Sequence, residues 1–295
     1  MRLEIGVRVM KNQRNRSVTP RLLLSVTFAL LSFVFLLSSA GCNSSLNASP
    51  SEVTSDTSNI RATSNELEVD FLDVGQGDAA LITLGEHAML IDGGEKAYSP
   101  LIMDVLKERG ITKLDYVINS NPHDDYVGGL SGAFQAASVG AVFSSVDDYD
   151  TQGFKTFIAA AEEQGLTITV PQNGDELDFA GASLTFYMTT DPSDSTGGNC
   201  LVIQLEYGSY SVLFTGDMTS DEEQELLDAN VMLNSTVLMV SQHGSDNSTS
   251  DAFLKAVNPS TAVISVGEDN IYGLPSEKTL AKIHERGIDL FRTDL

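Results

Sequence analysis

A nine-residue turn that begins at Asn121 constrains the fold and the chemistry of this chain more than any other segment. It reads Asn-Pro-His-Asp-Asp-Tyr-Val-Gly-Gly and follows an apolar stretch expected to be a strand at residues 115–118. His123 and Asp125 lie two positions apart in it, so an imidazole and a carboxylate can face one cation. The pattern predicts a metal-binding loop at the end of a strand.

Five further segments each combine an apolar stretch or a turn with polar side chains. They occur in a regular order along residues 66–295. These segments are Phe71–Ala79, Leu90–Gly94, Leu213–Asp217, Gln242–Ser245 and Tyr272–Pro275.

Together these segments resemble a known family. The turn is similar to the H-x-H-x-D-H-x-G-G signature of the metallo-β-lactamase superfamily, and the other segments resemble the soluble hydrolase domain of the competence protein ComEC and its stand-alone relatives. The resemblance implies an α/β fold, a four-layer αββα sandwich, with a metal site at one edge built from loops that follow strands.

The resemblance also implies a ligand set that departs from the signature at two positions. Asn121 and Tyr126 stand where the family has its outer histidines, and Gln242 and Leu274 stand where relatives often have histidine. An amide oxygen or a phenolate would make the set rich in oxygen, which favours Mn²⁺ or Mg²⁺ over Zn²⁺. The expected metal ligands are His123, Asp125, Asp217, His243, Asn121 and Tyr126.

Two functions follow from this degraded site. In the first, a divalent metal, zinc or manganese, activates a water that attacks a phosphodiester or other ester, and Asp125 or Asp217 orients the hydroxide. In the second, the protein is a catalytically eroded pseudoenzyme that acts as a binding or scaffolding module. Occupancy by one ion or by none stays open between them.

The amino terminus has the order of a secretory signal. Six basic residues precede an apolar run at 22–37, and Ser-Ser-Ala-Gly-Cys follows at 38–42. This order predicts a lipoprotein signal peptide at 1–41 and a diacylated Cys42, which would anchor the protein to the extracytoplasmic side of the cell membrane. An uncleaved signal anchor is the alternative, and Met10 is a second candidate start.

Composition and charge set the remaining expectations. Residues 42–65 are rich in Ser, Thr and Asn, as flexible tethers are, and residues 66–295 form the metallo-β-lactamase-like domain. Loss of residues 1–41 would leave 11 basic against 40 acidic residues, a formal charge of −29. This charge disfavours duplex nucleic acid and leaves a small molecule or short phosphoester as the expected substrate. The oligomeric state stays open.

Periodicity predicts alternating strands and helices from residue 66 onward. Strands are expected near 67–74, 79–84, 87–91, 115–118, 139–144, 166–170, 183–189, 200–206, 210–215, 236–240, 261–266 and 288–291. Helices are expected near 99–109, after Gly129, and near 152–164, 219–229, 249–257 and 276–286.

Overall fold

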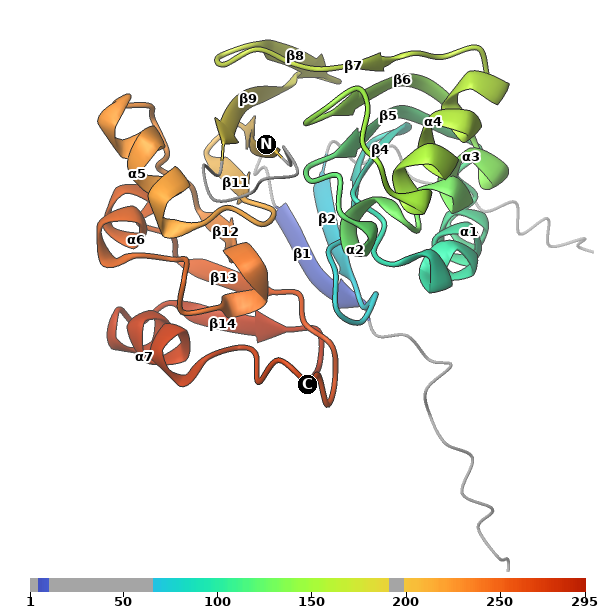
Figure 1. Cartoon of the computed structure of the whole chain (residues 1–295). Helices are drawn as coiled ribbons and strands as arrows, with labels where there is room; N and C mark the ends of the chain where they lie inside the picture. Colours follow the sequence, from blue (N-terminus) through green and yellow to red (C-terminus); the bar gives the residue numbers. More distant parts are fainter. Residues whose placement is uncertain (1–4, 11–65, 191–198) are drawn as a thin grey trace, which may run out of the picture. The chain divides into compact units, whose positions relative to one another are not determined.

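The computed structural model describes residues 5–10, 66–190 and 199–295 (Figure 1). All of these residues belong to one compact unit of the chain. The apolar run at 22–37, Cys42 and the tether at 42–65 lie outside the described residues. Among the helices that are described, none has both the length and the apolar character that a membrane span requires.

Two seven-stranded sheets form the centre of this unit. The first sheet follows chain order and contains β1 (Ile5–Met10), β2 (Leu67–Leu72), β3 (Ala80–Leu84), β4 (His87–Ile91), β5 (Lys113–Asn119), β6 (Ser138–Ser144) and β7 (Ile168–Thr169). The second sheet contains β8 (Glu176–Phe179), β9 (Ala182–Thr190), β10 (Asn199–Tyr207), β11 (Tyr210–Phe214), β12 (Val237–Met239), β13 (Thr261–Ile264) and β14 (Asp289–Arg292), also in chain order.

Alternating side chains on the strands explain why the two sheets pack face to face. In β2, Leu67, Val69 and Phe71 point into the core between the sheets, while Leu72 joins a core on the opposite face. Phe71 meets Phe214 of the second sheet with ring centroids 6.1 Å apart. Strands that are buried on both faces read as nearly continuous apolar runs, which is the pattern seen here.

Helices cover the outer face of each sheet (Figure 1). The first sheet carries α1 (Ser99–Glu108), α2 (Asp124–Val127), α3 (Ser131–Ala136) and α4 (Gln152–Glu163). The second carries α5 (Ser220–Asp228), α6 (Asp251–Val257) and α7 (Glu277–Glu285). The predicted four-layer αββα sandwich is confirmed.

Parallel pairing directs the functional loops to common edges. β4, β5 and β6 are parallel neighbours in the first sheet, and β11, β12 and β13 are parallel neighbours in the second. The carboxyl ends of parallel strands lie at the same edge of a sheet, where α/β proteins place their binding sites. The loops after these strands contain the residues expected to carry the chemistry.

Two strands of the structure were not expected from the sequence. β8 at 176–179 is short and half exposed, so it has little apolar periodicity. β1 at 5–10 falls within the segment assigned to the signal peptide, and it pairs in parallel with β2. Removal of residues 1–41, which stays a prediction, would take β1 away.

Candidate functional site

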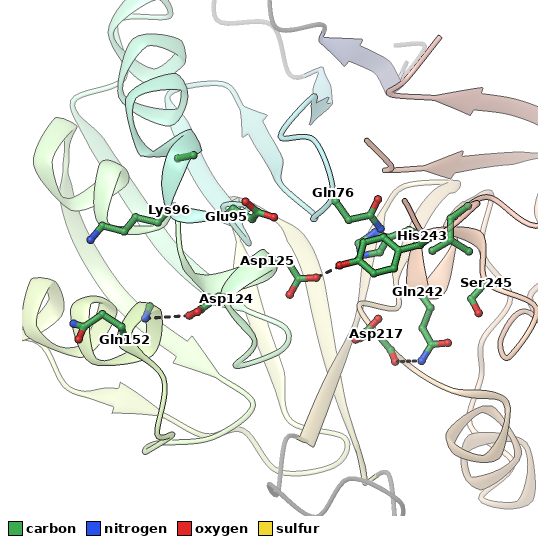
Figure 2. Close-up of a pocket in the computed structure, with 14 residues that line it drawn as sticks. Gln76, Glu95, Lys96, Asp124, Asp125, Gln152, Asp217, Gln242, His243 and Ser245 are labelled. Carbon is green, nitrogen blue, oxygen red and sulfur yellow. Dashed lines mark hydrogen bonds and ion pairs between the residues drawn. The ribbon is translucent and has the colours of Figure 1, made fainter. Parts of the chain in front are cut away.

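A cavity of about 690 Å³ lies where the loops of the two sheets meet (Figure 2). The first sheet contributes the loop after β2, the segment after β4 and the turn after β5, with Gln76, Glu95 and Asp125. The second sheet contributes the loops after β11 and β12, with Asp217 and His243. Residues from these five separate segments therefore line one cavity.

The turn after β5 is held by its own amide groups. Asn121 is buried, and its side-chain oxygen accepts the backbone N–H of His123 at 3.0 Å. The side chain of Asn119 donates to the main-chain oxygen of Asn121 at 2.7 Å. Asn121 therefore uses its amide oxygen to shape the loop.

The carboxylate of Asp92 supports this turn by accepting hydrogen bonds from Asn119 and Ser120. Its Oδ1 accepts the backbone N–H of Ser120 at 2.7 Å and the amide of Asn119 at 3.2 Å, and its Oδ2 accepts the Ser120 hydroxyl at 2.6 Å. Asp92 is buried and has a left-handed backbone with φ 56°. Burial raises the pKa of its carboxyl well above the ordinary value, although these hydrogen bonds oppose the rise.

Close backbone crossing explains the glycines that follow the turn. A Cβ placed on Gly129 would lie 2.0 Å from the main-chain oxygen of Gly93, so no side chain fits there. Gly129 also donates its backbone N–H to Gly94 at 2.8 Å. The loops after β4 and β5 are thereby pressed together beside the cavity.

The four retained ligands form two pairs. His123 Nδ1 lies 3.8 Å from Asp217 Oδ2, and His243 Nε2 lies 3.8 Å from Asp125 Oδ2. In each pair, an imidazole from a loop of one sheet faces a carboxylate from a loop of the other sheet. His123 begins α2 and its side chain is partly exposed, whereas His243 is buried. Four of the six expected ligands therefore lie in two imidazole–carboxylate pairs.

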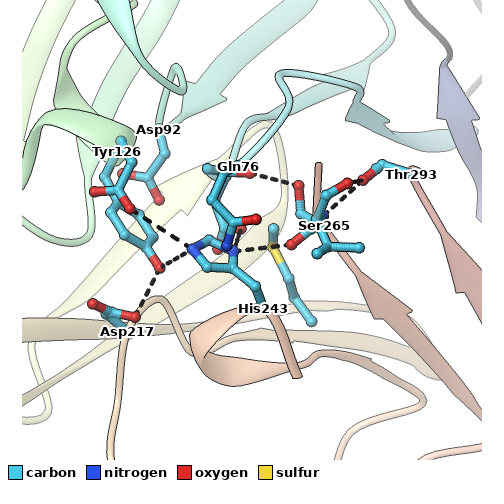
Figure 3. Close-up of polar contacts among 12 residues, drawn as sticks. Gln76, Asp92, Tyr126, Asp217, His243, Ser265 and Thr293 are labelled. Atoms are coloured by element: carbon cyan, nitrogen blue, oxygen red, sulfur yellow. Dashed lines mark hydrogen bonds and ion pairs between the residues drawn. The ribbon is translucent and has the colours of Figure 1, made fainter. Parts of the chain in front are cut away.

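Tyr126 links the two pairs, because its hydroxyl reaches Asp217 of one pair and His243 of the other (Figure 3). Its side chain is fully buried, its hydroxyl donates to Asp217 Oδ1 at 3.1 Å and lies 3.4 Å from His243 Nε2, and its ring stacks on the His243 ring. Burial and the nearby charges of Asp217, Asp78 and Asp125 raise the pKa of the phenol well above 10. The hydroxyl consequently stays protonated and serves as a hydrogen-bond donor.

His243 is fixed by contacts on both ring nitrogens. Its Nδ1 lies 2.9 Å from the main-chain oxygen of Ser265 and 3.5 Å from Asp78 Oδ1. Burial lowers the pKa of the imidazole, but hydrogen bonds to Asp125 and Asp78 and the neighbouring negative charges outweigh it and raise this pKa well above 6.5. Its φ of 51° is left-handed, a strained conformation that proteins retain mainly where a side chain must be aimed.

The imidazoles and carboxylates of the cavity are side chains that can bind a divalent cation. Within the described ranges no three histidine, cysteine or carboxylate side chains are grouped closely enough to enclose an ion. Mg²⁺ and Mn²⁺ prefer oxygen ligands, and Mg²⁺ commonly keeps several waters and uses one or two carboxylates together with substrate phosphates. Asp217 and Asp125 are carboxylates of this kind, and each lies 3.8 Å from an imidazole, that of His123 or of His243.

Several cavity residues were missed or underrated from the sequence. Asp78, which is buried behind the cavity, lies against His243, with its Oδ1 3.5 Å from the His243 Nδ1. Gln76, Glu95 and Lys96 line the cavity, and Lys96 extends away from Asp125 (Figure 2). No spacing rule links them to the ligand turn, because they come from loops after β2 and β4.

Comparisons with known proteins identify the family of this chain. A profile of the metallo-β-lactamase superfamily matches residues 72–268. ComE operon protein 3 of Bacillus subtilis is 29% identical over 253 residues, which cover 78% of this chain and 32% of that protein. Recombination protein 2 of Haemophilus influenzae is 31% identical over 227 residues, which cover 74% of this chain and 26% of that protein. The chain thus spans about a third or less of these relatives' length.

A solved structure shares the fold. A variant of the β-hydroxylase CmlA superposes with a TM-score of 0.50 at 12% identity, over 74% of this chain and 51% of that one. At this identity the likeness extends to the fold alone. From the profile match and the curated relatives, the chain belongs to the metallo-β-lactamase superfamily and is similar to ComEC-like competence proteins.

Proposed function

We propose that this protein is a divalent-cation-dependent hydrolase that acts on a small phosphodiester or other ester. The observation that carries the proposal is the excess of acidic groups in the cavity. Four carboxylates line it, from Glu95, Asp124, Asp125 and Asp217, against Lys96 as the one lysine or arginine among the described lining residues. Such an excess of negative charge favours a bound cation and opposes a bare phosphate ester.

The residues of the chain have distinct roles in this proposal. A bound divalent cation would polarise the ester and make water more acidic. Tyr126 holds Asp217 Oδ1, which leaves Oδ2 directed towards His123. Asp125, whose side chain is about one-third exposed, can accept a proton from a water in the cavity. These two carboxylates would hold the ion and orient the attacking water.

The proposal is tested with a chromogenic phosphodiester, bis(p-nitrophenyl) phosphate. We expect hydrolysis that depends on added Mn²⁺, is abolished by EDTA, and falls at least about 100-fold in Asp217→Asn. The control is Asp289→Asn, an exposed position in β14, which should keep full activity. Metal-independent or equal rates in the two variants would contradict the proposal.

The eroded binding module is the second candidate, and the buried Tyr126 favours it. The phenol fills the space between Asp217 and His243 and leaves no close group of three ligands in the described part of the chain. A module of this kind would bind Mn²⁺ weakly or not at all and would hydrolyse no ester. Calorimetric titration with Mn²⁺, run beside the hydrolysis assay, separates the two functions.

We further propose that the protein is exported and held at the membrane through a lipid on Cys42. The support is the basic, apolar, small-residue order that precedes Cys42 in the sequence. Cys42→Ala should abolish lipid labelling and release the protein from the membrane fraction. An unchanged precursor mass and unchanged fractionation would refute the anchor.

A further inference from the structure

The loop after β13, residues 267–275, borders the cavity with apolar side chains and is called the rim loop below. Tyr272 and Leu274 both line the cavity, whereas Ile271 is not among its described lining residues. The side chains at the tip are open to solvent, with Tyr272 66% exposed and Ile271 91% exposed. Ligand cavities combine apolar and aromatic walls with a few polar groups, and loops beside them select the ligand. The hydrolysis proposed above gives Tyr272 and Leu274 no task.

The side chain of Asn270 fixes the shape of the rim loop. Its Nδ2 donates to the main-chain oxygens of Gly267 at 3.0 Å and of Leu274 at 2.7 Å. Its Oδ1 accepts the backbone N–H of Leu274 at 3.0 Å. These three bonds tie the two ends of the loop together, so the exposed tip at residues 271–273 is held between fixed ends.

Both ends of the rim loop also rest on loops that carry cavity residues. A Cβ placed on Gly267 would lie 3.0 Å from the backbone nitrogen of Gln76, so the two chains pass in close contact. At the other end, Ser276 donates its backbone N–H at 2.9 Å to Gly244, the residue after His243. The rim loop therefore extends the side of the cavity on which Gln76 and His243 lie (Figure 2).

Charge restricts what can lie against the rim loop. Glu95 and Asp124 line the cavity outside the two imidazole–carboxylate pairs, and Glu268 and Asp269 are exposed on the rim loop itself. These carboxylates repel a second anionic group on a substrate. A cation would have to lose water to touch Leu274, a cost that an uncharged group does not have. The group that fits this side of the cavity is therefore uncharged and apolar.

We propose that the rim loop is a specificity site, in which Tyr272 stacks on an uncharged aromatic ring of the substrate and Leu274 packs against the edge of that ring. The substrate class is then an aryl ester, with its ester group near Asp125 and Asp217. Stacked aromatic pairs add about two- to tenfold in affinity beyond the contact area alone, so a ring is preferred to a saturated group of the same size. The inference rests on the proposed function for the ester, while the ring site is tested by binding alone.

A series of ligands that cannot be hydrolysed tests the ring site on the full chain. Methyl esters of phenylphosphonate, cyclohexylphosphonate and methylphosphonate are titrated in the presence of Mg²⁺, and their dissociation constants are measured by ligand-observed NMR. We expect the phenyl compound to bind at least about threefold more tightly than the cyclohexyl compound, because only the phenyl ring can stack. A matched ester with a trimethylammonium group in place of the ring should bind more weakly than the phenyl compound.

Matched variants assign the preference to one side chain. Tyr272→Leu should make the phenyl and cyclohexyl compounds bind equally, and Tyr272→Phe should keep the preference, because the ring and not the hydroxyl is used. Ile271→Ala is the control: it removes an even more exposed side chain from the same tip, outside the cavity lining, and should keep the preference. The exposure of both positions leaves the fold intact in these variants.

Several outcomes would overturn the ring site. These are equal binding of the phenyl and cyclohexyl compounds to the wild type, tighter binding of the trimethylammonium compound, no saturable binding of any compound, or an unchanged preference in Tyr272→Leu.

Hydrolysis of bis(p-nitrophenyl) phosphate by the same variants separates this inference from the proposed function. Tyr272→Leu should raise KM about fivefold and change kcat by less than about twofold, because Tyr272 touches the ring and not the reacting atoms. A phenyl preference in a wild type that hydrolyses nothing would refute the hydrolase and keep the ring site. Hydrolysis with the same KM in Tyr272→Leu would refute the ring site and keep the hydrolase.

Discussion

Tyr126 replaces an imidazole at the centre of the site and changes what its neighbours can do. The phenol donates to Asp217 and lies beside His243, so both groups that could bind a second ion are engaged with a protonated hydroxyl. Asn121, the other departure, has turned inward to cap the loop. The two substitutions therefore have different effects, one inside the ligand cluster and one in the turn that supports it.

Restoring both imidazoles should increase zinc binding. Asn121→His with Tyr126→His would supply neutral imidazoles, which bind Zn²⁺ far better than an amide oxygen or a protonated phenol. Equilibrium dialysis with metal analysis should find more zinc bound than in the wild type, and His123→Ala in that background should remove the gain. Tyr126→His alone should give most of the effect, since Asn121 is engaged in the loop. Folded protein with no added zinc would show that the ligands cannot close on an ion.

Asp92 should matter for stability more than for chemistry, because it satisfies buried donors of Asn119 and Ser120. Asp92→Ala strands these donors and places alanine at φ 56°, so we expect a loss of about 3 kcal/mol in urea unfolding. Asp92→Asn keeps an acceptor and tolerates the left-handed backbone, and should lose about 1 kcal/mol. Asp92→Gly removes the side chain without the backbone strain and should fall between them. Equal losses in all three would refute the hydrogen-bond explanation.

At the scale of secondary-structure elements, the sequence predicted long periodic segments well. The helices at 99–108 and 152–163 and the strands of the buried sheets match their apolar patterns closely. β8 was not predicted because its four residues, two of which are exposed, are too few to show a clear periodicity. β1 was not predicted because a basic segment before an apolar run is typical of a signal peptide. Its pairing also depends on β2, which lies more than fifty residues further along the chain. Long-range pairing of this sort has no local signature.

The residues of the candidate site were also predicted only in part from the sequence. His123, Asp125, Asp217 and His243 were identified because turns of recognisable composition carry them, and the structure brings them together in pairs. The contact between Ser265 and His243 could not be predicted, because it depends on how a left-handed backbone orients the His243 ring.

The crossing of the two loops beside the cavity gives an element-scale prediction. Gly129→Ala would force a Cβ to within 2.0 Å of the Gly93 oxygen, so the loops must separate. We expect a loss of about 3 kcal/mol in urea unfolding and weaker Mn²⁺ binding. Gly110→Ala is the comparison: it has open space and a φ of 66°, so it should lose about 1 kcal/mol through backbone strain alone and leave Mn²⁺ binding unchanged. Equal losses, or normal Mn²⁺ binding in Gly129→Ala, would show that the loops adapt.

At the scale of the whole molecule, charge separates this protein from ordinary binders of nucleic acid. The complete chain has a formal charge of −24, and removal of residues 1–41 would make it −29. The curated relatives include proteins whose names refer to competence and recombination, yet this chain matches only about a third or less of their length. Contacts with DNA phosphates need clustered lysine and arginine, and the cavity offers Lys96 alone among its described lining residues.

Binding to duplex DNA should therefore be absent at physiological salt. Non-specific DNA-binding proteins reach dissociation constants of roughly 10⁻⁴ to 10⁻⁶ M there, and we expect no anisotropy change for a labelled 20-base-pair duplex up to about 100 µM protein. The titration is repeated with Mn²⁺ present, because an ion in the acidic cavity could attract a phosphate without any basic surface. Binding that needs Mn²⁺ and disappears in Asp217→Asn would assign the contact to the cavity. Micromolar binding without Mn²⁺, with a steep dependence on salt, would instead reveal a basic surface and contradict the prediction.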